Sequence, residues 1–292
     1  MKLSHQLLAC AYPFLQVAKK LPTRIQPYTP HRLRILLYHD IAPHDLTRFA
    51  TQLRWISNRW KFVSPEKFGD LMKGNAPLEG DNLLLTFDDG FISNRLVAEQ
   101  VLNPMGIQAL FFVVSEFVQF EMIEDAQKFI TDRIMPDTFK KGIPKHLYNM
   151  GWSDLSALLD QGHSIGAHTK THAQLSLLTH QYLEEEIVDS ANCLEKNLGT
   201  KIDHFAYPFG DLSSFSMSAL FIANQRFKFV HSGLRGINRP NQPSVLKRDP
   251  TTPNDQTNLV NSFLEGYADW YYAKRCRTLD QWSYKVSSNN IR

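Results

Sequence analysis

Three short groups of residues carry most of the chemistry that this sequence can perform. They are TFDDG at residues 86–90, HTKTH at residues 168–172 and AYPFG at residues 206–210. Each group follows a short apolar run, so we expect each to lie at the carboxyl end of a β-strand. Catalytic residues of parallel α/β folds come from these strand ends, and the three groups are therefore expected to meet at one site.

The first two groups supply the donors that hold a divalent metal ion in a hydrolytic site. One aspartate and two histidines offer carboxylate oxygen and neutral imidazole nitrogen, and such a set leaves a position for water. A second carboxylate nearby can act as a general base. Because successive strand residues point in opposite directions, Asp88 and Asp89 can take these two different roles. A bound cation would also offset their mutual repulsion.

Each group also has an ordinary structural interpretation. Asp-Asp-Gly is a common turn, because Asp accepts local backbone hydrogen bonds and Gly adopts positive φ. With eleven histidines in 292 residues, one pair spaced four apart has little weight, and YPFG is another frequent turn. The informative observation is that all three occur in order, each after an apolar strand.

Taken together, TFDDG, HTKTH and AYPFG resemble the three leading motifs of the NodB-like polysaccharide deacetylases, carbohydrate esterase family 4. The resemblance covers roughly residues 33–250. It implies an α/β fold, a distorted (β/α) barrel of the NodB-homology type. It also implies metal-dependent hydrolysis that removes N-acetyl groups from the amino sugars of a polysaccharide or glycan precursor, an attack on carbon–nitrogen bonds other than peptide bonds.

The resemblance also implies a role for individual residues. Asp88 would be the general base, and the divalent metal, Zn²⁺ by expectation, would be bound by Asp89, His168 and His172. The backbone N–H of Phe209 would help to bind the oxyanion. The substrate-binding residues of the third motif would be Tyr207 and Pro208.

Two departures from the family pattern affect these roles. Many members carry Arg two residues before the motif proline, where this chain has Ala206, so the usual partner of the base carboxylate is missing. No histidine follows His231, so the late motif that supplies the general acid is absent as well. FAYPFG resembles the subset that acts on exopolysaccharides and surface glycans, in which the acid comes from a YH motif on the first strand. That resemblance makes His39 the candidate acid, with His231 as the competitor and a buried structural role for His39 as the alternative.

The surrounding pattern alternates apolar runs with amphipathic helices, which predicts a parallel sheet covered by helices. The expected strands are 34–39, 82–87, 107–114, 163–168, 202–208, 227–233 and 244–248. The expected helices include 46–56, 152–161, 179–198 and 254–275. The predicted division is an N-terminal helical segment (1–32), a deacetylase barrel (33–275) with a helical insertion (116–151), and a C-terminal tail (276–292). The insertion is either a lid over the site or a peripheral addition.

Composition excludes few classes of function. The chain is 43% hydrophobic and 21% charged with a formal net charge of +3, which is too small and too scattered an excess to indicate a nucleic-acid partner. Its three cysteines are far apart, which argues against a disulfide framework or a cysteine metal site. The segment 1–22 has apolar residues at helical spacing. It is interpreted as a packed helix, with a membrane-surface helix and a signal peptide as alternatives.

These observations lead to expectations about partners and place. The substrate is expected to be a glycan or a lipid- or nucleotide-linked amino sugar, and peripheral membrane contact would come through residues 1–22. We expect a cytoplasmic location or the cytoplasmic face of the membrane, with a secreted or periplasmic location as the alternative. The competing functions are a catalytically silent metal- and glycan-binding protein, and an amidohydrolase or deformylase acting on another amide.

Three further predictions concern single residues or pairs. Arg248 and Asp249 are expected to form a structural salt bridge rather than to take part in catalysis. Thr169 is expected to make local hydrogen bonds. The aromatic run WYY (270–272) is expected to pack within its helix layer.

Overall fold

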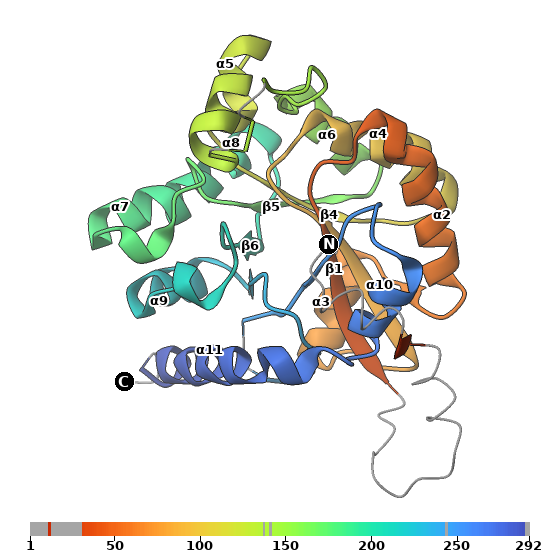
Figure 1. Ribbon diagram of the computed structural model, residues 1–292. Helices are drawn as coiled ribbons and strands as arrows, with labels where there is room; N and C mark the ends of the chain where they lie inside the picture. The colour runs from red at the N-terminus through yellow and green to blue at the C-terminus, as the bar shows by residue number, and fades with distance from the viewer. Residues whose placement is uncertain (1–10, 13–30, 137, 140–141, 243–244, 290–292) are drawn as a thin grey trace, which may run out of the picture.

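A curved, fully parallel sheet forms the centre of the protein (Figure 1). The computed structural model describes residues 11–12, 31–136, 138–139, 142–242 and 245–289. The strands lie in the order β7-β6-β5-β4-β3-β1-β8, and β2 pairs with β3 outside this path. Their bounds are β1 Arg32–Tyr38, β2 Lys61–Phe62, β3 Asp81–Phe87, β4 Leu110–Val113, β5 Ser164–Ala167, β6 His204–Ala206, β7 Phe229–His231 and β8 Asp249–Pro250.

One segment near the end of the sheet connects its two edges. Leu246 forms a parallel bridge with His231 of β7, and Asp249 of β8 pairs with Leu36 of β1. The sheet therefore curves until β7, at one edge, is linked through residues 246–250 to β1, near the other edge. The carboxyl ends of β1, β3, β5 and β6 consequently face a common space, and the predicted α/β architecture with a parallel sheet is confirmed.

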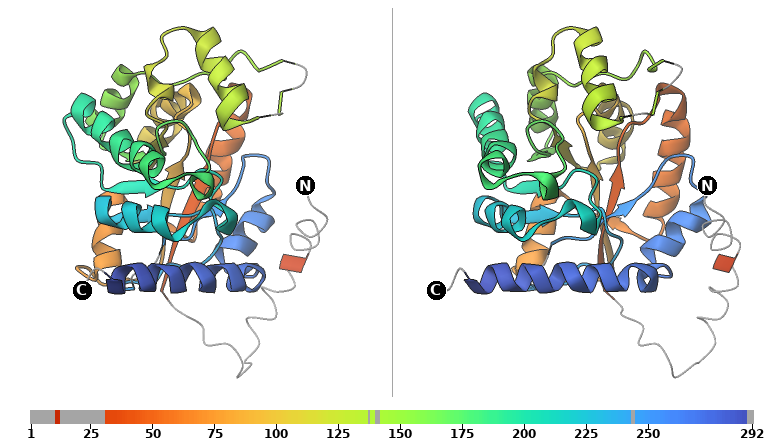
Figure 2. Two further views of the ribbon diagram at one scale, coloured as in Figure 1. Left: turned by 90° about the vertical axis from the view of Figure 1, so that its left-hand side faces the viewer. Right: turned by 60° about the vertical axis from the view of Figure 1, so that its left-hand side comes forward.

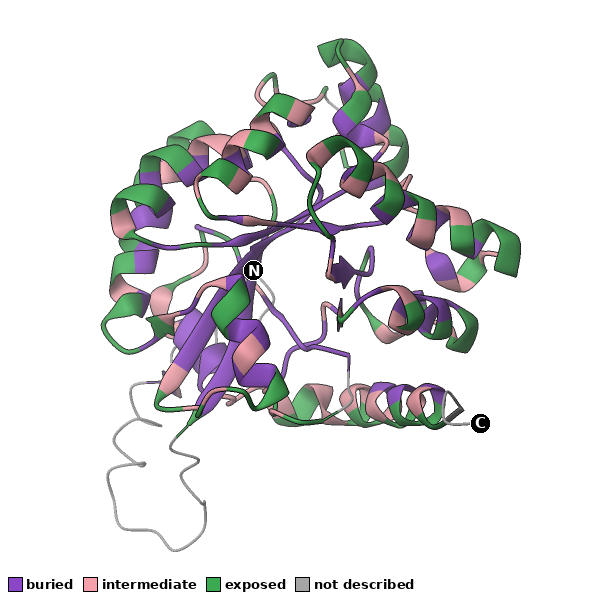
Figure 3. Ribbon diagram, turned by 180° about the vertical axis from the view of Figure 1, so that it is seen from behind, coloured by how far each residue is buried: buried purple, intermediate pink, exposed green. Residues whose placement is uncertain are grey.

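Helices surround the sheet, with their exposed faces outward and the buried residues gathered along the strands (Figures 2 and 3). The α-helices are α2 Leu46–Ser57, α3 Pro65–Lys73, α4 Ile92–Val97, α5 Ile123–Phe129, α6 Trp152–Asp160, α7 His180–Glu184, α8 Ser190–Leu198, α9 Met217–Arg226, α10 Thr257–Leu264 and α11 Asp269–Asn289. The 3-10 and π segments are η1 Pro43–Asp45, η2 Ala98–Leu102, η3 Asn103–Met105, η4 Phe117–Gln119, η5 Ile130–Ile134, η6 Leu175–Leu177, η7 Glu185–Asp189 and η8 Leu212–Ser214.

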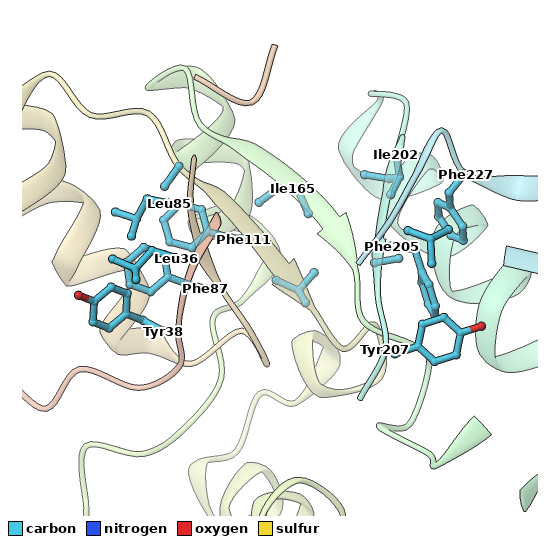
Figure 4. Packing of buried hydrophobic residues seen from close by; sticks show 14 of the residues in the cluster. Leu36, Tyr38, Leu85, Phe87, Phe111, Ile165, Ile202, Phe205, Tyr207 and Phe227 are labelled. Carbon is cyan, nitrogen blue, oxygen red and sulfur yellow. The ribbon is translucent and has the colours of Figure 1, made fainter. Parts of the chain in front are cut away.

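Burial on both faces explains why the strands are continuous apolar runs rather than alternating ones. All seven residues of β1 are buried, including its two arginines. Leu36 and Tyr38 of β1 pack with residues of β3 and β4 in the cluster shown in Figure 4, where the rings of Phe87 and Phe111 stack with centroids 5.0 Å apart. Fully burying such a side chain contributes about 1.5–3 kcal/mol. Parallel sheets covered on both faces have this composition.

The C-terminal part differs from the prediction. The expected helix 254–275 is two helices, α10 and α11, because Gly266 between them adopts φ +85 and interrupts the helical path. The expected tail from residue 276 is wrong, since α11 continues to Asn289. Three elements, β2, α3 and α9, were not predicted, and the last strand is 249–250 rather than the expected 244–248.

Two other predicted segments have different outcomes. The insertion 116–151 contains α5 together with the short helical segments η4 and η5. The N-terminal segment 1–32 lies outside the described residues, apart from Ala11, Tyr12 and the residues that lead into β1. Within the part of the chain that the structure describes, no helix is both long enough and apolar enough to cross a bilayer.

Candidate active site

The turn that follows β3 separates the two adjacent carboxylates. Asp89 has φ +76, a left-handed conformation that is rare outside glycine. Hydrogen bonds to three different parts of the fold hold the turn: Asp88 N–H donates to the carbonyl of Tyr38 at 3.0 Å, Val114 N–H to that of Asp89 at 3.3 Å, and Met150 N–H to that of Gly90 at 2.9 Å. The turn is therefore anchored to β1, to the end of β4 and to the insertion.

The HTKTH loop after β5 is also held in an unusual conformation. Thr169 and His172 have φ +66 and +60. Glu186, on the π-helical segment η7, accepts hydrogen bonds from the backbone N–H groups of Lys170 at 3.0 Å and Thr171 at 2.9 Å. It also accepts one from the Thr171 hydroxyl at 2.6 Å. No role for Glu186 was predictable, because nothing in a long polar helix marks one glutamate as the partner of a loop fifteen residues earlier.

The third motif forms a tight turn after β6. Gly210 N–H donates to the carbonyl of Pro208 at 2.7 Å, and Phe209, between them, has φ +62. This i to i+2 hydrogen bond defines a γ-turn. Gly210 cannot carry a side chain, since a Cβ there would lie 2.4 Å from the backbone nitrogen of Gly233. Among the described residues the backbone N–H of Phe209 has no hydrogen-bond partner.

Asp89, His168 and His172 converge as a possible metal site. Asp89 Oδ1 lies 3.4 Å from Nε2 of each histidine, and one donor atom from each residue lies within 4.8 Å of the others. The other ring nitrogens are engaged. Nδ1 of His168 donates to the carbonyl of Ala206 at 2.8 Å, and Nδ1 of His172 to that of Arg133 at 3.1 Å. Such hydrogen bonds fix the tautomer that leaves Nε2 free to bind a metal.

The electrostatics of Asp89 fit a cation at this position. The carboxylate is 3% exposed, and its Oδ1 has no hydrogen-bond partner among the described residues. Burial alone would raise the pKa of Asp89, but the nearby His168 and His172 rings outweigh it and lower the pKa below its ordinary value. A buried, ionised and unpartnered oxygen beside two free imidazole nitrogens is the environment that a divalent cation satisfies.

Asp88 has a different partner, Arg248. Arg248 Nη1 and Nη2 donate to the two carboxylate oxygens of Asp88 at 2.6 and 2.8 Å, and both side chains are almost completely buried. Arg248 Nε also donates to the carbonyl of Ser232 at 2.7 Å. The arginine that Ala206 does not provide therefore reaches the base position from the segment before β8. The predicted salt bridge between Arg248 and its neighbour Asp249 is wrong, because Asp249 pairs with Arg34 instead.

A cavity of about 300 Å³ brings most of the predicted residues together. Seven of the eight line it, namely His39, Asp88, Asp89, His168, His172, Tyr207 and Phe209. Pro208 is buried behind the turn and does not line it. Ile134 and Met135 of the insertion do line it. The insertion therefore contributes to the cavity wall, and the backbone carbonyl of Arg133 accepts the hydrogen bond from Nδ1 of His172.

The two candidate acids occupy different environments. His39 follows β1 at the cavity wall, is exposed, and has no hydrogen bond to its ring among the described residues. His231 is fully buried, lies 3.0 Å from His204 between ring nitrogens, and does not line the cavity. Burial lowers the pKa of His231 well below its ordinary value. The geometry therefore favours His39 as a group that can meet a substrate.

Two other predicted residues behave differently from expectation. The Thr169 hydroxyl is buried without a hydrogen-bond partner in the described chain, so the predicted local hydrogen bond is wrong. Tyr207 borders the cavity but packs mainly in the core, where its ring stacks on Phe215 at 3.8 Å and its hydroxyl has no partner among the described residues.

Comparison with known proteins gives the family model that the chain matches and the fold that it shares with solved structures. A family model described as polysaccharide deacetylase matches residues 75–225. The structure is similar to that of IcaB from Ammonifex degensii, with 24% identity, a TM-score of 0.65 and coverage of 80% of this chain and 97% of that one. It is also similar to the deacetylase PplD of Streptococcus pyogenes in complex with acetate, with 21% identity, a TM-score of 0.61 and coverage of 81% and 99%. These similarities confirm the predicted NodB-type fold.

One curated protein is similar to this chain over part of the length of both. YxkH of Bacillus subtilis (strain 168) is 22% identical over 201 residues, which are 67% of this chain and 63% of YxkH. The chain thus spans somewhat less than two thirds of that relative.

Proposed function

The chain belongs to the polysaccharide deacetylase family, and from this premise we propose that it removes N-acetyl groups from the amino sugars of a polysaccharide or glycan precursor by metal-dependent hydrolysis. One observation carries the proposal. Asp89, His168 and His172 converge within 4.8 Å in a cavity that also contains Asp88. This combination supplies a cation site and a separate carboxylate base in one place.

The metal proposed for the site is a divalent cation, and Zn²⁺ suits its one carboxylate and two imidazole donors. Asp89, His168 and His172 would hold it. When bound, such a cation polarises an amide carbonyl and makes water a better nucleophile at neutral pH. The affinity of the site for the cation depends on both imidazole rings being neutral, with Nε2 unprotonated. The hydrogen bonds that both Nδ1 atoms donate favour this tautomer.

The protein's own residues then divide the proton transfers. Asp88 accepts a proton from the attacking water, and the bidentate contact with Arg248 holds its carboxylate in position. The N–H of Phe209 donates to the oxygen on which negative charge develops. His39, on the same cavity wall, protonates the amine that leaves. General acid–base steps of this kind contribute about 10²–10⁴-fold each.

Acetate release from β-linked N-acetylglucosamine oligomers, measured with Zn²⁺ added, tests the proposal. Asp88→Asn and His172→Ala should each lower turnover at least about 100-fold. Asp203→Asn, which removes a carboxylate paired with Lys228 away from the cavity, should not. If the wild-type chain released no acetate from several acetylated sugars but bound them, the silent glycan-binding alternative would replace this proposal. Release of formate but not acetate would favour the deformylase alternative.

A second experiment separates the acid from the base. 4-Nitrophenyl acetate has a leaving group that needs no proton, whereas an amide nitrogen must be protonated as it leaves. We expect His39→Gln to lose amide hydrolysis and to keep ester hydrolysis, and Asp88→Asn to lose both. Equal loss of both activities in His39→Gln would assign the acid role elsewhere.

Location and substrate form are proposals as well. We propose action at the cytoplasmic face of the membrane on a glycan or on a lipid- or nucleotide-linked amino sugar. Cell fractionation with sequencing of the mature N-terminus tests the location, and a processed N-terminus outside the cytoplasm would refute it.

A further inference from the structure

The outward face of α11 has an unusual composition. Its exposed residues recur at helical spacing along the whole helix and are Trp270, Tyr271, Lys274, Arg277, Gln281, Tyr284, Lys285 and Ser288. We call these eight residues the α11 face. Figure 2 shows α11 lying along one side of the molecule with its length open to solvent. The predicted packing of WYY is wrong for its first two members, since Trp270 is 77% and Tyr271 61% exposed.

The α11 face carries positive charge and no acid. Lys274, Arg277 and Lys285 have no ion pair within the described residues. The two acidic residues of the helix are only partly exposed and have cationic partners on other elements, since Asp269 pairs with Arg34 at 2.9 Å and Asp280 pairs with Lys247. The charge on the outward face is therefore uncompensated, and it attracts an anionic partner.

The aromatic residues mark the two ends of this face. Trp270 and Tyr271 lie at the first turn, and Tyr284, 67% exposed, lies near the last. Fourteen residues of helix separate Trp270 from Tyr284, which is about 21 Å. Exposed Trp and Tyr are costly in water but favourable at a membrane interface, where an apolar ring and a polar edge are both satisfied.

The helix is firmly docked, so its outward face is rigid. Leu279 and Val286 are buried in the main core, and Ser283 Oγ accepts a hydrogen bond from Val245 N–H at 3.3 Å. Arg275 pairs with Asp211 at 3.1 Å. A flat, rigid stripe with aromatic residues at both ends and cations between them matches an extended anionic plane better than a small ligand.

We propose that the α11 face binds the headgroup layer of an anionic phospholipid bilayer, with α11 parallel to the membrane plane. Exposed cations near an anionic surface each contribute about fivefold in binding, so the three together contribute about 100-fold. The aromatic residues add contact with the interface, and salt weakens the charged part. No residue of the α11 face lines the catalytic cavity.

The test is co-sedimentation of the full chain with vesicles of phosphatidylcholine containing 30% phosphatidylglycerol, compared with pure phosphatidylcholine. We expect binding to the anionic vesicles and a decrease of about 100-fold in the variant K274Q/R277Q/K285Q. The control variant K61Q/K67Q/K196Q removes the same charge from exposed sites elsewhere and should bind as the wild type does. Acetate release from a soluble oligosaccharide should be unchanged in both variants, so failure here is distinguishable from failure of the catalytic proposal.

A direct contact measurement completes the test. Brominated phosphatidylglycerol should quench part of the tryptophan fluorescence of the wild type, and Trp270→Phe should remove that part. Tyr182→Ser, which removes a 56% exposed aromatic residue on α7, serves as the control. Unchanged vesicle binding in the triple variant of α11, or binding to DNA that depends on α11 without binding to vesicles, would overturn the proposal.

Discussion

The buried pair of Arg248 and Asp88 allows the sharpest quantitative test of the site. Arg248→Met removes the cation and leaves a carboxylate that is 3% exposed without its bidentate partner. Removing one member of a buried ion pair destabilises proteins by about 3–5 kcal/mol. Arg248 also donates to the carbonyl of Ser232 and lies 5.1 Å from the Phe112 ring. Part of the loss therefore does not come from Asp88.

A double-mutant cycle isolates the part that does. Asp88→Asn keeps the shape of the side chain and removes the charge, so Arg248→Met should cost less in that background. We expect a coupling free energy of about 2–3 kcal/mol, near the upper end for residues in contact. Urea unfolding in the presence of a chelator measures it, because a bound cation would otherwise compensate the orphaned carboxylate. Arg275→Met with Asp211→Asn is the matched exposed pair, for which about 0–1 kcal/mol is expected.

The rate of hydrolysis should also depend on the contact between Arg248 and Asp88. Arg248→Lys keeps a charge but cannot form the two parallel hydrogen bonds, so its activity should fall between those of the wild type and Arg248→Met. Added guanidinium should restore part of the activity of Arg248→Met and none of that of Asp88→Asn. A coupling below about 0.5 kcal/mol, the usual error of additivity, would refute the positioning role of Arg248.

Three other outcomes are expected. Zn²⁺ at 100 times its dissociation constant should stabilise the wild type by about 2.7 kcal/mol, and the shift should be absent in His172→Ala. His163 is buried with Nδ1 accepting from Ala109 N–H and Nε2 beside Asn103 Oδ1, and burial lowers its pKa from 6.5 to about 4. As the pH falls, the unfolded chain therefore binds a proton at His163 before the folded chain does. The free energy of unfolding should fall by about 3 kcal/mol from pH 6.5 to 4. Urea unfolding measured across this pH range should show a flatter dependence in His163→Gln. Tyr207→Phe removes a hydroxyl without a hydrogen-bond partner in the described chain, so thermal unfolding should show a gain of about 1 kcal/mol; a loss of activity would instead support its predicted contact with substrate.

Much of the site was predictable from the sequence because it follows the strands directly. Asp88, His168 and Phe209 come one to three residues after apolar runs, and parallel strands bring such positions to one edge of the sheet. His39 was predicted as the last residue of the first strand (34–39), and the structure places it directly after β1. Long apolar runs between polar segments are a strong signal, and they predicted β1, β3, β5 and β6 to within a few residues.

Other features depend on contacts that no local pattern records. Arg248 is 160 residues from Asp88, and a strand of two residues after it leaves almost no periodicity to read. Glu186 looks like any exposed glutamate of a polar helix. The continuation of α11 was missed because its outward face is polar and aromatic, while its apolar contacts at Leu279 and Val286 are too sparse to suggest a buried helix.

The backbone explains how two adjacent aspartates can serve one site. Of the five non-glycine residues with positive φ in the described chain, four belong to the three motifs: Asp89, Thr169, His172 and Phe209. Each such conformation costs of order 1–3 kcal/mol, a sum comparable with the net stability of a typical domain. Hydrogen bonds from outside the turns offset that cost: Val114 N–H donates to the Asp89 carbonyl, and Tyr38, Glu186 and Arg133 accept from the turns. The strained turns orient the two carboxylates differently. Asp88 contacts Arg248, whereas Asp89 lies beside His168 and His172. The repulsion between adjacent carboxylates is therefore avoided by giving each its own positive partner, a guanidinium for one and a cation site for the other.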